Sequence, residues 1–334
     1  MGIMKIIKSG LFTTVQDMGR IGFQRYGIPV AGAMDDFSFR VANILVGNDE
    51  NAAALETTFM GPNIQIDFDG FIAITGANME PKLNDNNIKM WRSIDVHKGD
   101  NITLSGASQG FRSYIAFSGG LNVTQILNSK STYVRGSLGG YNGRKLMEGD
   151  EIPVDSSNSK AEPGKYISPG YIPRYNKENL IRVILGPQDD HFSPETIDTF
   201  LNSSYKITSE ADRMGYRLEG PALNHIKGPD IISDGIVFGS VQVPGHGSPI
   251  IMMADRQTTG GYTKIATVIW ADLPLLAQMG PGDTIHFQKV TIEEGQDIFA
   301  QYEENISNIK IRVNNSNIIQ EETKTYNVKI TKNK

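Results

Sequence analysis

The sequence predicts a mainly β protein with a few short helices. Apolar residues alternate with polar ones, or run together, in many short segments such as residues 63–68 (NIQIDF) and 181–186 (IRVILG), which is typical of β-strands. Gly-Asp precedes such a segment three times, at residues 98–104, 148–154 and 281–287, as a turn that enters a strand. A chain of 334 residues also suggests two domains, because domains average roughly 150 residues.

The first strand is expected at residues 4–7, and a glycine-rich stretch, residues 10–36, follows it. Its glycines allow positive φ angles and a close approach of the backbone to a ligand. Charged and amide side chains stand between the glycines, and binding sites are commonly built from such loops beside a rigid scaffold. The stretch therefore predicts a binding loop, with an irregular structural connection as the alternative.

A helix is predicted directly after the glycine-rich stretch. Asp35 or Asp36 can accept hydrogen bonds from its first free N–H groups, and Gly47 ends the apolar periodicity. A carboxylate at a helix N-terminus is also favoured by local electrostatics, so a capping role without a ligand stays open for Asp35.

A segment poor in apolar residues, 155–179, divides the chain in the middle. Its Ser, Pro, Asn and Lys content is typical of a linker, and strand-like patterns resume at residue 181. The predicted organisation is a first β domain at residues 1–160 with the glycine-rich stretch, a linker at 161–178, a second β domain at 179–290, and a C-terminal helix and polar tail at 291–334.

Three helices are predicted in the second half of the sequence. Ser193 as a cap and Pro194 at the first helical position predict a short helix, and another is expected near residues 273–279. A capping box at residues 291–294 starts a helix that we expect to run to about Ile306. Weak alternation of apolar residues after that point predicts an edge hairpin or a partly disordered tail.

The composition excludes several classes of function. Cysteine is absent, which excludes thiol catalysis, zinc–thiolate sites and disulfides. The 32 basic and 37 acidic residues are intermixed and give a net charge of −5, so no basic surface for nucleic acid is predicted. No segment resembles a signal peptide or approaches a membrane span of about 20 apolar residues. We expect a cytoplasmic protein that binds neither nucleic acid nor membrane.

Three further patterns predict no site. Residues 106–110 fit G-x-S-x-G, but an alternating strand follows where a hydrolase needs a helix, so Ser108 is assigned to a hairpin turn. Residues 139–146 lack the full P-loop pattern. The five histidines have no metal-ligand spacing, so no metal site is predicted, and His246 in PGHGSP is the one that a turn explains least well.

Long, unusual words of the sequence resemble one protein family. They include TTVQDMGRIGFQRYGIPVAGAMD and LETTF in the first half, and DRMGYRLEGP, GSVQVPGHGSPIIMMADRQTTGGY and LLAQMGPGD in the second. Over roughly residues 4–290 they resemble the carboxyltransferase-like family that contains the C subunit of 5-oxoprolinase, the second subunit of allophanate hydrolase and the carboxyltransferase part of urea carboxylase. The resemblance implies two tandem cyclophilin-like antiparallel β-barrels.

The resemblance also implies one component of a larger enzyme. By this resemblance, the chain is expected to work with an A subunit and a KipI-like B subunit to open 5-oxo-L-proline to L-glutamate at the expense of ATP. A lactam amide is a poor electrophile, and phosphorylation of its oxygen creates a good leaving group, while cations and N–H groups stabilise the developing charge. We expect ATP as the cofactor, Mg²⁺ as a further candidate, and no appreciable activity of the chain alone, since it contains no complete nucleotide-binding motif.

The resemblance and this chemistry assign candidate site residues. The cations expected nearest the phosphates or the substrate carboxylate, which guanidinium groups bind bidentately, are Arg20, Arg213, Arg217 and Arg256. The carboxylates expected to act as a general base or to hold Mg²⁺ are Asp17, Asp35 and Asp255. The side chains expected to orient the lactam by hydrogen bonds are Gln16, Gln242, Gln257 and Tyr262.

The glycine-rich stretch and residues 255–262 are expected to face one cleft between the two domains. Each combines glycines with charged and amide side chains, and every buried unsatisfied polar group costs about 1–3 kcal/mol. Convergence on a small polar ligand at a domain junction would satisfy these groups. Two unrelated surface loops are the alternative.

Two other functions stay open at this point. One is a biotin-dependent carboxyltransferase component that acts on urea or a similar small amide, with biotin as its cofactor, although the chain has no ATP-grasp pattern and no A-M-K-M biotin attachment word. The other is a KipA-like regulatory protein that binds a kinase-inhibitor partner. Neighbouring genes would separate the two enzymes, because a lactam-utilisation gene favours oxoprolinase and a biotin carboxylase gene favours carboxyl transfer.

Overall fold

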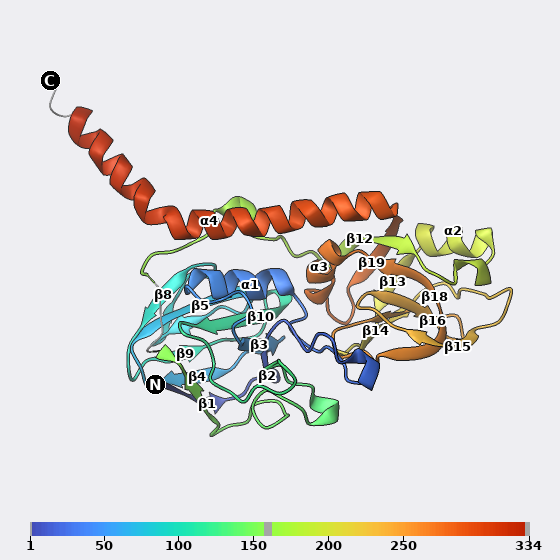
Figure 1. Ribbon diagram of the computed structural model, residues 1–334, viewed down its shortest axis with the longest axis horizontal. Helices are drawn as coiled ribbons and strands as arrows, with labels where there is room; N and C mark the ends of the chain where they lie inside the picture. The colour runs from blue at the N-terminus through green and yellow to red at the C-terminus, as the bar shows by residue number, and fades with distance from the viewer. Residues whose placement is uncertain (1, 157–161, 331–334) are drawn as a thin grey trace.

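The computed structural model describes residues 2–156 and 162–330, with side chains described as far as residue 315. The chain is mainly β, as the sequence predicts (Figure 1). Strands within residues 2–154, here called the first half, form two sheets, and strands within residues 178–289, the second half, form a barrel. Helix α4 (Ile292–Ile330) crosses over both halves at the top of Figure 1.

The two sheets of the first half have the strand orders β11-β1-β4-β9-β6-β7 and β2-β3-β10-β5-β8, with antiparallel neighbours. One apolar core includes Ile6 and Ile64 from the first sheet and Ile74 and Ile115 from the second, because alternate side chains of each strand face inward. The strands are β1 (Gly2–Lys8), β2 (Phe12–Gln16), β3 (Ala54–Thr58), β4 (Asn63–Ile66), β5 (Gly70–Asn78), β6 (Lys82–Leu83), β7 (Asn86–Asn87), β8 (Ser93–Val96), β9 (Asn101–Thr103), β10 (Gln109–Phe117) and β11 (Glu151–Val154).

The barrel of the second half has the order β12-β19-β13-β14-β17-β16-β18, and a pairing between β12 and β18 closes it. β15 extends the sheet beside β18. Val183, Tyr205 and Val241 belong to the apolar core of this half. The strands are β12 (Glu178–Leu185), β13 (Ser204–Ile207), β14 (Gly215–Glu219), β15 (Asp230–Gly235), β16 (Ser240–Val243), β17 (Ile250–Met252), β18 (Thr259–Val268) and β19 (Thr284–Lys289).

The structure differs in two details from a pair of antiparallel barrels. The described strands of the first half lie in two sheets and not in one closed sheet. In the barrel, β12 and β19 run parallel, because the chain leaves β18, passes through α3 (Leu273–Ala277) and re-enters beside β12 in the same direction.

The helix starts agree with the sequence predictions. Asp35 caps α1, and Ser193 caps the second helix with Pro194 at its first position. Thr291 and Glu294 exchange the two hydrogen bonds of a capping box at the start of α4. The first two helices are α1 (Asp36–Leu45) and α2 (Pro194–Asn202).

The prediction for the C-terminal tail was wrong for its described part. Helix α4 does not end near Ile306 but continues to Ile330, and no hairpin forms within the described residues. Ile306, Ile309 and Val313 are buried in a core with α1, at helical spacing, whereas Ile311 is 56% exposed. The apolar residues near 309–313 therefore alternate in the sequence but belong to a helix.

The bend at Ser108 precedes a strand, as predicted, because β10 begins at the next residue. Ser108 Oγ donates to the carbonyl of Asn78 at 3.1 Å. β9 and β10 belong to different sheets, so this bend is a connection between sheets and not a hairpin turn.

The segment between the halves packs against the first half and α4. Ile167 belongs to the same buried core as Trp91 and Ile309. The division into domains at 1–160 and 179–290 with a linker at 161–178 stays a prediction, and residues 157–161 lie outside the described part. No described helix is both long and apolar enough to cross a membrane.

Candidate functional site

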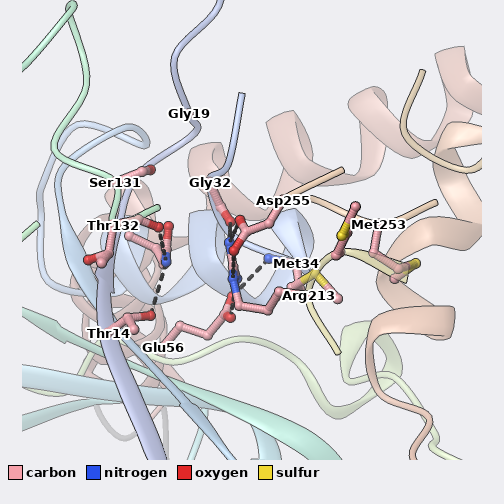
Figure 2. Close-up of polar contacts among 12 residues, drawn as sticks. Thr14, Gly19, Gly32, Met34, Glu56, Ser131, Thr132, Arg213, Met253 and Asp255 are labelled. Atoms are coloured by element: carbon pink, nitrogen blue, oxygen red, sulfur yellow. Dashed lines mark hydrogen bonds and ion pairs between the residues drawn. The ribbon is translucent and has the colours of Figure 1, made fainter. Parts of the chain in front are cut away.

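Arg213 lies at the centre of the junction between the two halves (Figure 2). It stands in the connection between β13 and β14, and its guanidinium holds both oxygens of Asp255 at 2.8 and 3.1 Å. The same group donates to Glu56 of β3 and, at 2.7 Å, to the carbonyl of Gly32. One buried cation therefore joins the glycine-rich stretch, a strand of the first half and the loop after β17.

The pKa values at this junction follow from burial and charge. Burial lowers the pKa of Arg213, but Asp255 and Glu56 raise it more, so the net shift is upward. Burial raises the pKa of Asp255 in spite of the opposing effect of Arg213. Because these charges are paired within the protein, we assign Arg213 and Asp255 to the architecture of the junction.

Glu56 is a residue of this junction that the sequence prediction missed. Its Oε2 accepts from the backbone N–H of Met34 and from the hydroxyl of Tyr114, both at 2.8 Å, and its Oε1 pairs with Arg213. Tyr114 Oη in turn accepts from Asp35 N at 2.8 Å. The available signal was an acidic residue inside the apolar strand ALETT, which indicates a buried partner.

Asp17 anchors the glycine-rich stretch to the segment around Ser131. Its Oδ1 accepts from Gly19 N at 2.8 Å, from Ser129 Oγ at 2.7 Å and from Ser131 Oγ, and its Oδ2 accepts from Lys130 N at 2.5 Å. The carboxylate is saturated by donors from the protein. It is thus poorly suited to act as a base or to hold Mg²⁺.

Arg20 lies in the same stretch and is a buried cation without an ion pair among the described residues. Its side chain is fully buried, Nε donates to Ile126 O at 3.3 Å, and Nη2 donates to Ser131 O. Nη1 is buried and has no partner in the described part of the chain. Burial lowers the pKa of Arg20, although the charges of Asp17 and Asp255 oppose this.

Arg256 has the same character in the second half. Its Nε donates to Ile236 O at 3.2 Å, its Nη1 to Met253 O at 3.4 Å, and its guanidinium lies 5.5 Å from the ring centre of Phe238. Burial lowers its pKa to about 10, and Asp255 opposes the shift. The described residues offer it carbonyl oxygens and a ring but no carboxylate within ion-pair distance.

The predicted amide side chains lie in different halves of the chain, Gln16 in the first and Gln242 and Gln257 in the second. Gln16 Nε2 donates to Thr14 and Thr132, while its Oε1 is buried without a partner in the described chain. Gln242 is buried, and its Nε2 likewise lacks a described partner. A Cβ at Gly260 would lie 2.8 Å from Gln242 Nε2 and 3.0 Å from the Nε2 of the exposed Gln257, so a side chain at this position would collide with both amides.

Tyr262 and Arg217 are exposed, and the structure does not bring Arg217 to the junction. Arg217 alternates in β14 with the buried Tyr216 and Leu218, so it faces outward, where it pairs with Glu210 at 3.2 Å. It lines a cavity of about 320 Å³ together with His246. The sequence word does not tell which face of the strand is buried, so it could not show that Arg217 faces away from the junction.

Asp35 is buried and accepts three hydrogen bonds. Ser38 N and Ser38 Oγ donate to it at 2.8 and 2.6 Å, and Gln278 Nε2 of the second half donates at 2.7 Å. Burial raises the pKa of Asp35 to about 7, although these hydrogen bonds lower it. It is therefore both the cap of α1 and a group that can exchange a proton near neutral pH.

The three predicted aspartates do not form a magnesium site. Each is held by protein donors or by Arg213, and among the described residues no three His, Asp or Glu side chains gather as metal ligands. Since the carboxylates do not fit the ion, no step is derived through Mg²⁺.

The glycine-rich stretch and the loop after β17 face one junction, as expected, but this junction is filled by side chains. Arg213 contacts both, and Met34 packs in the core of the barrel. Two cavities of about 710 and 580 Å³ lie elsewhere, and Gln109 and Tyr175 line both.

Comparison with known proteins shows to which proteins this chain is similar. The family described as carboxyltransferase domain, subdomain A and B, matches residues 26–289. The C subunit of 5-oxoprolinase from Escherichia coli (strain K12) is 38% identical over 318 residues, which cover 94% of this chain and 100% of that protein. The C subunit of 5-oxoprolinase from Haemophilus influenzae is 37% identical over 305 residues, which cover 91% of this chain and 96% of that protein.

A solved structure is also similar to nearly the whole chain. The urea carboxylase of Kluyveromyces lactis superimposes with a TM-score of 0.86 at 31% identity, over 92% of this chain and 29% of that chain. The present chain thus corresponds to under a third of that larger protein.

Proposed function

The chain belongs to the family of the carboxyltransferase domain, subdomains A and B, and from this premise we propose that it is the C subunit of an ATP-dependent 5-oxoprolinase. With an A subunit and a KipI-like B subunit as partners, it opens 5-oxo-L-proline to L-glutamate. The observation that carries the proposal is the 38% identity to the C subunit from E. coli, which spans the whole of that protein and 94% of this chain.

Four buried groups of the two halves support this substrate class. Arg20 and Arg256 are cations without a carboxylate partner in the described chain, and a carboxylate or phosphoryl group of a ligand would compensate them. The unpartnered Gln16 Oε1 and Gln242 Nε2 are one acceptor and one donor. Each is an unused hydrogen-bonding position for a polar ligand among the described residues.

The partners are proposed to supply what this chain lacks. It contains neither a P-loop nor an ATP-grasp pattern, so ATP binding is assigned to the assembly and not to the chain alone. Cytoplasmic localisation belongs to the same proposal.

The test is ATP- and 5-oxoproline-dependent release of glutamate by the purified chain, alone and after reconstitution with the A and B subunits. We expect turnover only in the complete assembly, and none when this chain is omitted. Full turnover by the isolated chain, or by the two partners without it, would contradict the proposal.

A second candidate is a carboxyltransferase component that receives a carboxyl group from a biotin carrier and acts on urea or a similar amide. The similarity to urea carboxylase over 92% of this chain favours it. Urea-dependent transfer of the carboxyl group from a carboxylated biotin carrier to a urea nitrogen, without glutamate release from 5-oxoproline, would replace the first proposal by this one.

A further inference from the structure

Strand β10 contains a bulge beside β5 that is shaped by two glycines. Its register with β5 shifts between Gln109, opposite Asn78, and Ser113, opposite Gly76. Gly76 and Gly110 both have positive φ, 80° and 78°, a conformation that other residues rarely adopt. The bulge turns the backbone N–H groups of residues 111 and 112 away from the ladder with β5.

The carboxamide of Gln278, from the residue after α3 in the second half, fills this bulge. Its Oε1 accepts from Phe111 N at 2.9 Å and from Arg112 N at 3.0 Å. Its Nε2 donates to Arg112 O at 2.8 Å and to Asp35 Oδ2 at 2.7 Å. All four hydrogen-bonding positions of the amide are thus used.

The surroundings leave just enough room for an amide. A Cβ at Gly110 would lie 2.8 Å from Gln278 Oε1, and one at Gly76 would lie 3.2 Å from Nε2 and 2.4 Å from Arg112 O. Any larger residue at either glycine would collide with the amide or its acceptor. The bulge, the two glycines and Asp35 therefore form a receptor for a C=O and N–H pair, here called the amide cradle.

The amide cradle borders open space. Gly110, Phe111 and Gln278 line the cavity of about 580 Å³, and Gly76 lines the neighbouring cavity of about 710 Å³. Both cavities therefore lie next to residues of the cradle.

We propose that the amide cradle is a binding site for a small lactam, and that Gln278 occupies it as an internal ligand in the free chain. The choice of a lactam rests on the proposed function, whereas the donors and acceptors require only an amide with at least one N–H. Two backbone N–H groups bind the lactam oxygen, and Asp35 or Arg112 O accepts from the lactam nitrogen. Two N–H groups on one carbonyl oxygen also polarise it for attack.

The competing explanation is that Gln278 only ties α3 to β10. That role needs the tethered side chain, whereas a binding site accepts the same groups from a free molecule. Removing the side chain and offering a free lactam separates the two.

The experiment uses the full-length chain with Gln278→Gly, a substitution tolerated by the backbone because residue 278 follows the last residue of α3. The probe is 2-pyrrolidone, and the matched control ligand is N-methyl-2-pyrrolidone, which lacks the N–H. Thermal unfolding and calorimetry measure binding. Gln278→Met is the control variant, because methionine refills the space without an amide.

We expect 2-pyrrolidone to raise the Tm of Gln278→Gly with saturation, and to bind about tenfold more tightly than N-methyl-2-pyrrolidone, since the latter leaves a buried acceptor unpaired. The wild-type and Gln278→Met chains should show no such rise at the same concentrations. Gln278→Ala gives the same comparison if the glycine variant does not fold.

Equal effects of both lactams on the emptied variants, or no effect of either, would overturn the proposal. This binding test needs neither ATP nor partners. A negative result therefore contradicts the amide cradle while the proposed function stands, and absent glutamate release in the assembly contradicts the function while binding stands.

Discussion

The three buried arginines that the sequence assigned to the site fall into two kinds. Arg213 has its charge matched by Asp255 and Glu56, whereas Arg20 and Arg256 reach only carbonyl oxygens in the described chain. A matched charge in the interior holds parts of a fold together, and an unmatched one is destabilising until an anion arrives. This difference separates residues that we assign to the architecture from residues that we assign to a ligand, whereas the family words assigned all three arginines to a ligand.

The largest expected effect on stability is that of Arg213→Met. It leaves Asp255 buried without its cation and Glu56 with only the more distant Arg112, at 3.9 Å, so unfolding free energy should fall by about 3–5 kcal/mol. Arg256→Met removes an unmatched charge and should change it by less than about 1 kcal/mol, in either direction. Urea unfolding of both variants makes the measurement, and equal losses would break the distinction between the two kinds of arginine.

The next effect concerns pH. Burial raises the pKa of Asp35 to about 7, so between its ordinary range near pH 4 and pH 7 the folded chain keeps a proton that the unfolded chain releases. Stability from this group is therefore present at low pH and is lost as the pH rises through 7. Asp35→Asn should flatten that part of the pH profile of unfolding free energy.

Asp36 and Asp255 also contribute to the pH dependence of the unfolding free energy, because burial raises their pKa values too. The comparison of Asp35→Asn with wild type isolates Asp35. An unchanged slope between pH 4 and 7 would show that Asp35 is ionised throughout.

A smaller loss is expected for Tyr302→Phe. The hydroxyl of Tyr302 in α4 donates to the buried Asp36 at 2.7 Å, and its removal should cost about 1–3 kcal/mol. Tyr262→Phe is the matched control, since Tyr262 is exposed. Thermal unfolding compares the two, and similar Tm values would mean that α4 does not stabilise the start of α1.

The smallest effect is expected for Arg217→Ala. Its ion pair with Glu210 is exposed, and such pairs contribute about 0–1 kcal/mol. Turnover of the assembly should stay close to that of wild type. A large loss of turnover would return Arg217 to the candidate site residues.

Local signals in the sequence predicted what depends on neighbouring residues. Asp35, Ser193 and the pair Thr291 and Glu294 were recognised as helix caps because a cap and its partner lie within a few residues. Family words located Arg213 and Asp255. The direction of Arg217 was missed because burial of one strand face is decided by the rest of the barrel.

Contacts between distant residues could not be predicted. Glu56 and Arg213 are separated by 157 residues, and Gln278 reaches a bulge 166 residues earlier. No periodic pattern of residues in the sequence indicates such pairs. The end of α4 was misjudged for a related reason: Ile309, Ile311 and Val313 alternate in the sequence, and only the contact of Ile309 and Val313 with the core around α1 shows that they belong to a helix.

The most direct test of the account is glutamate release by the assembly of the A and B subunits with the Arg256→Met chain, with Arg217→Ala measured beside it. We predict that Arg256→Met lowers turnover by about 100-fold or more while the chain stays folded, because the ligand loses its buried cation, an interaction worth about 3 kcal/mol. Full turnover by a folded Arg256→Met chain would contradict the assignment of the unmatched arginines to a ligand.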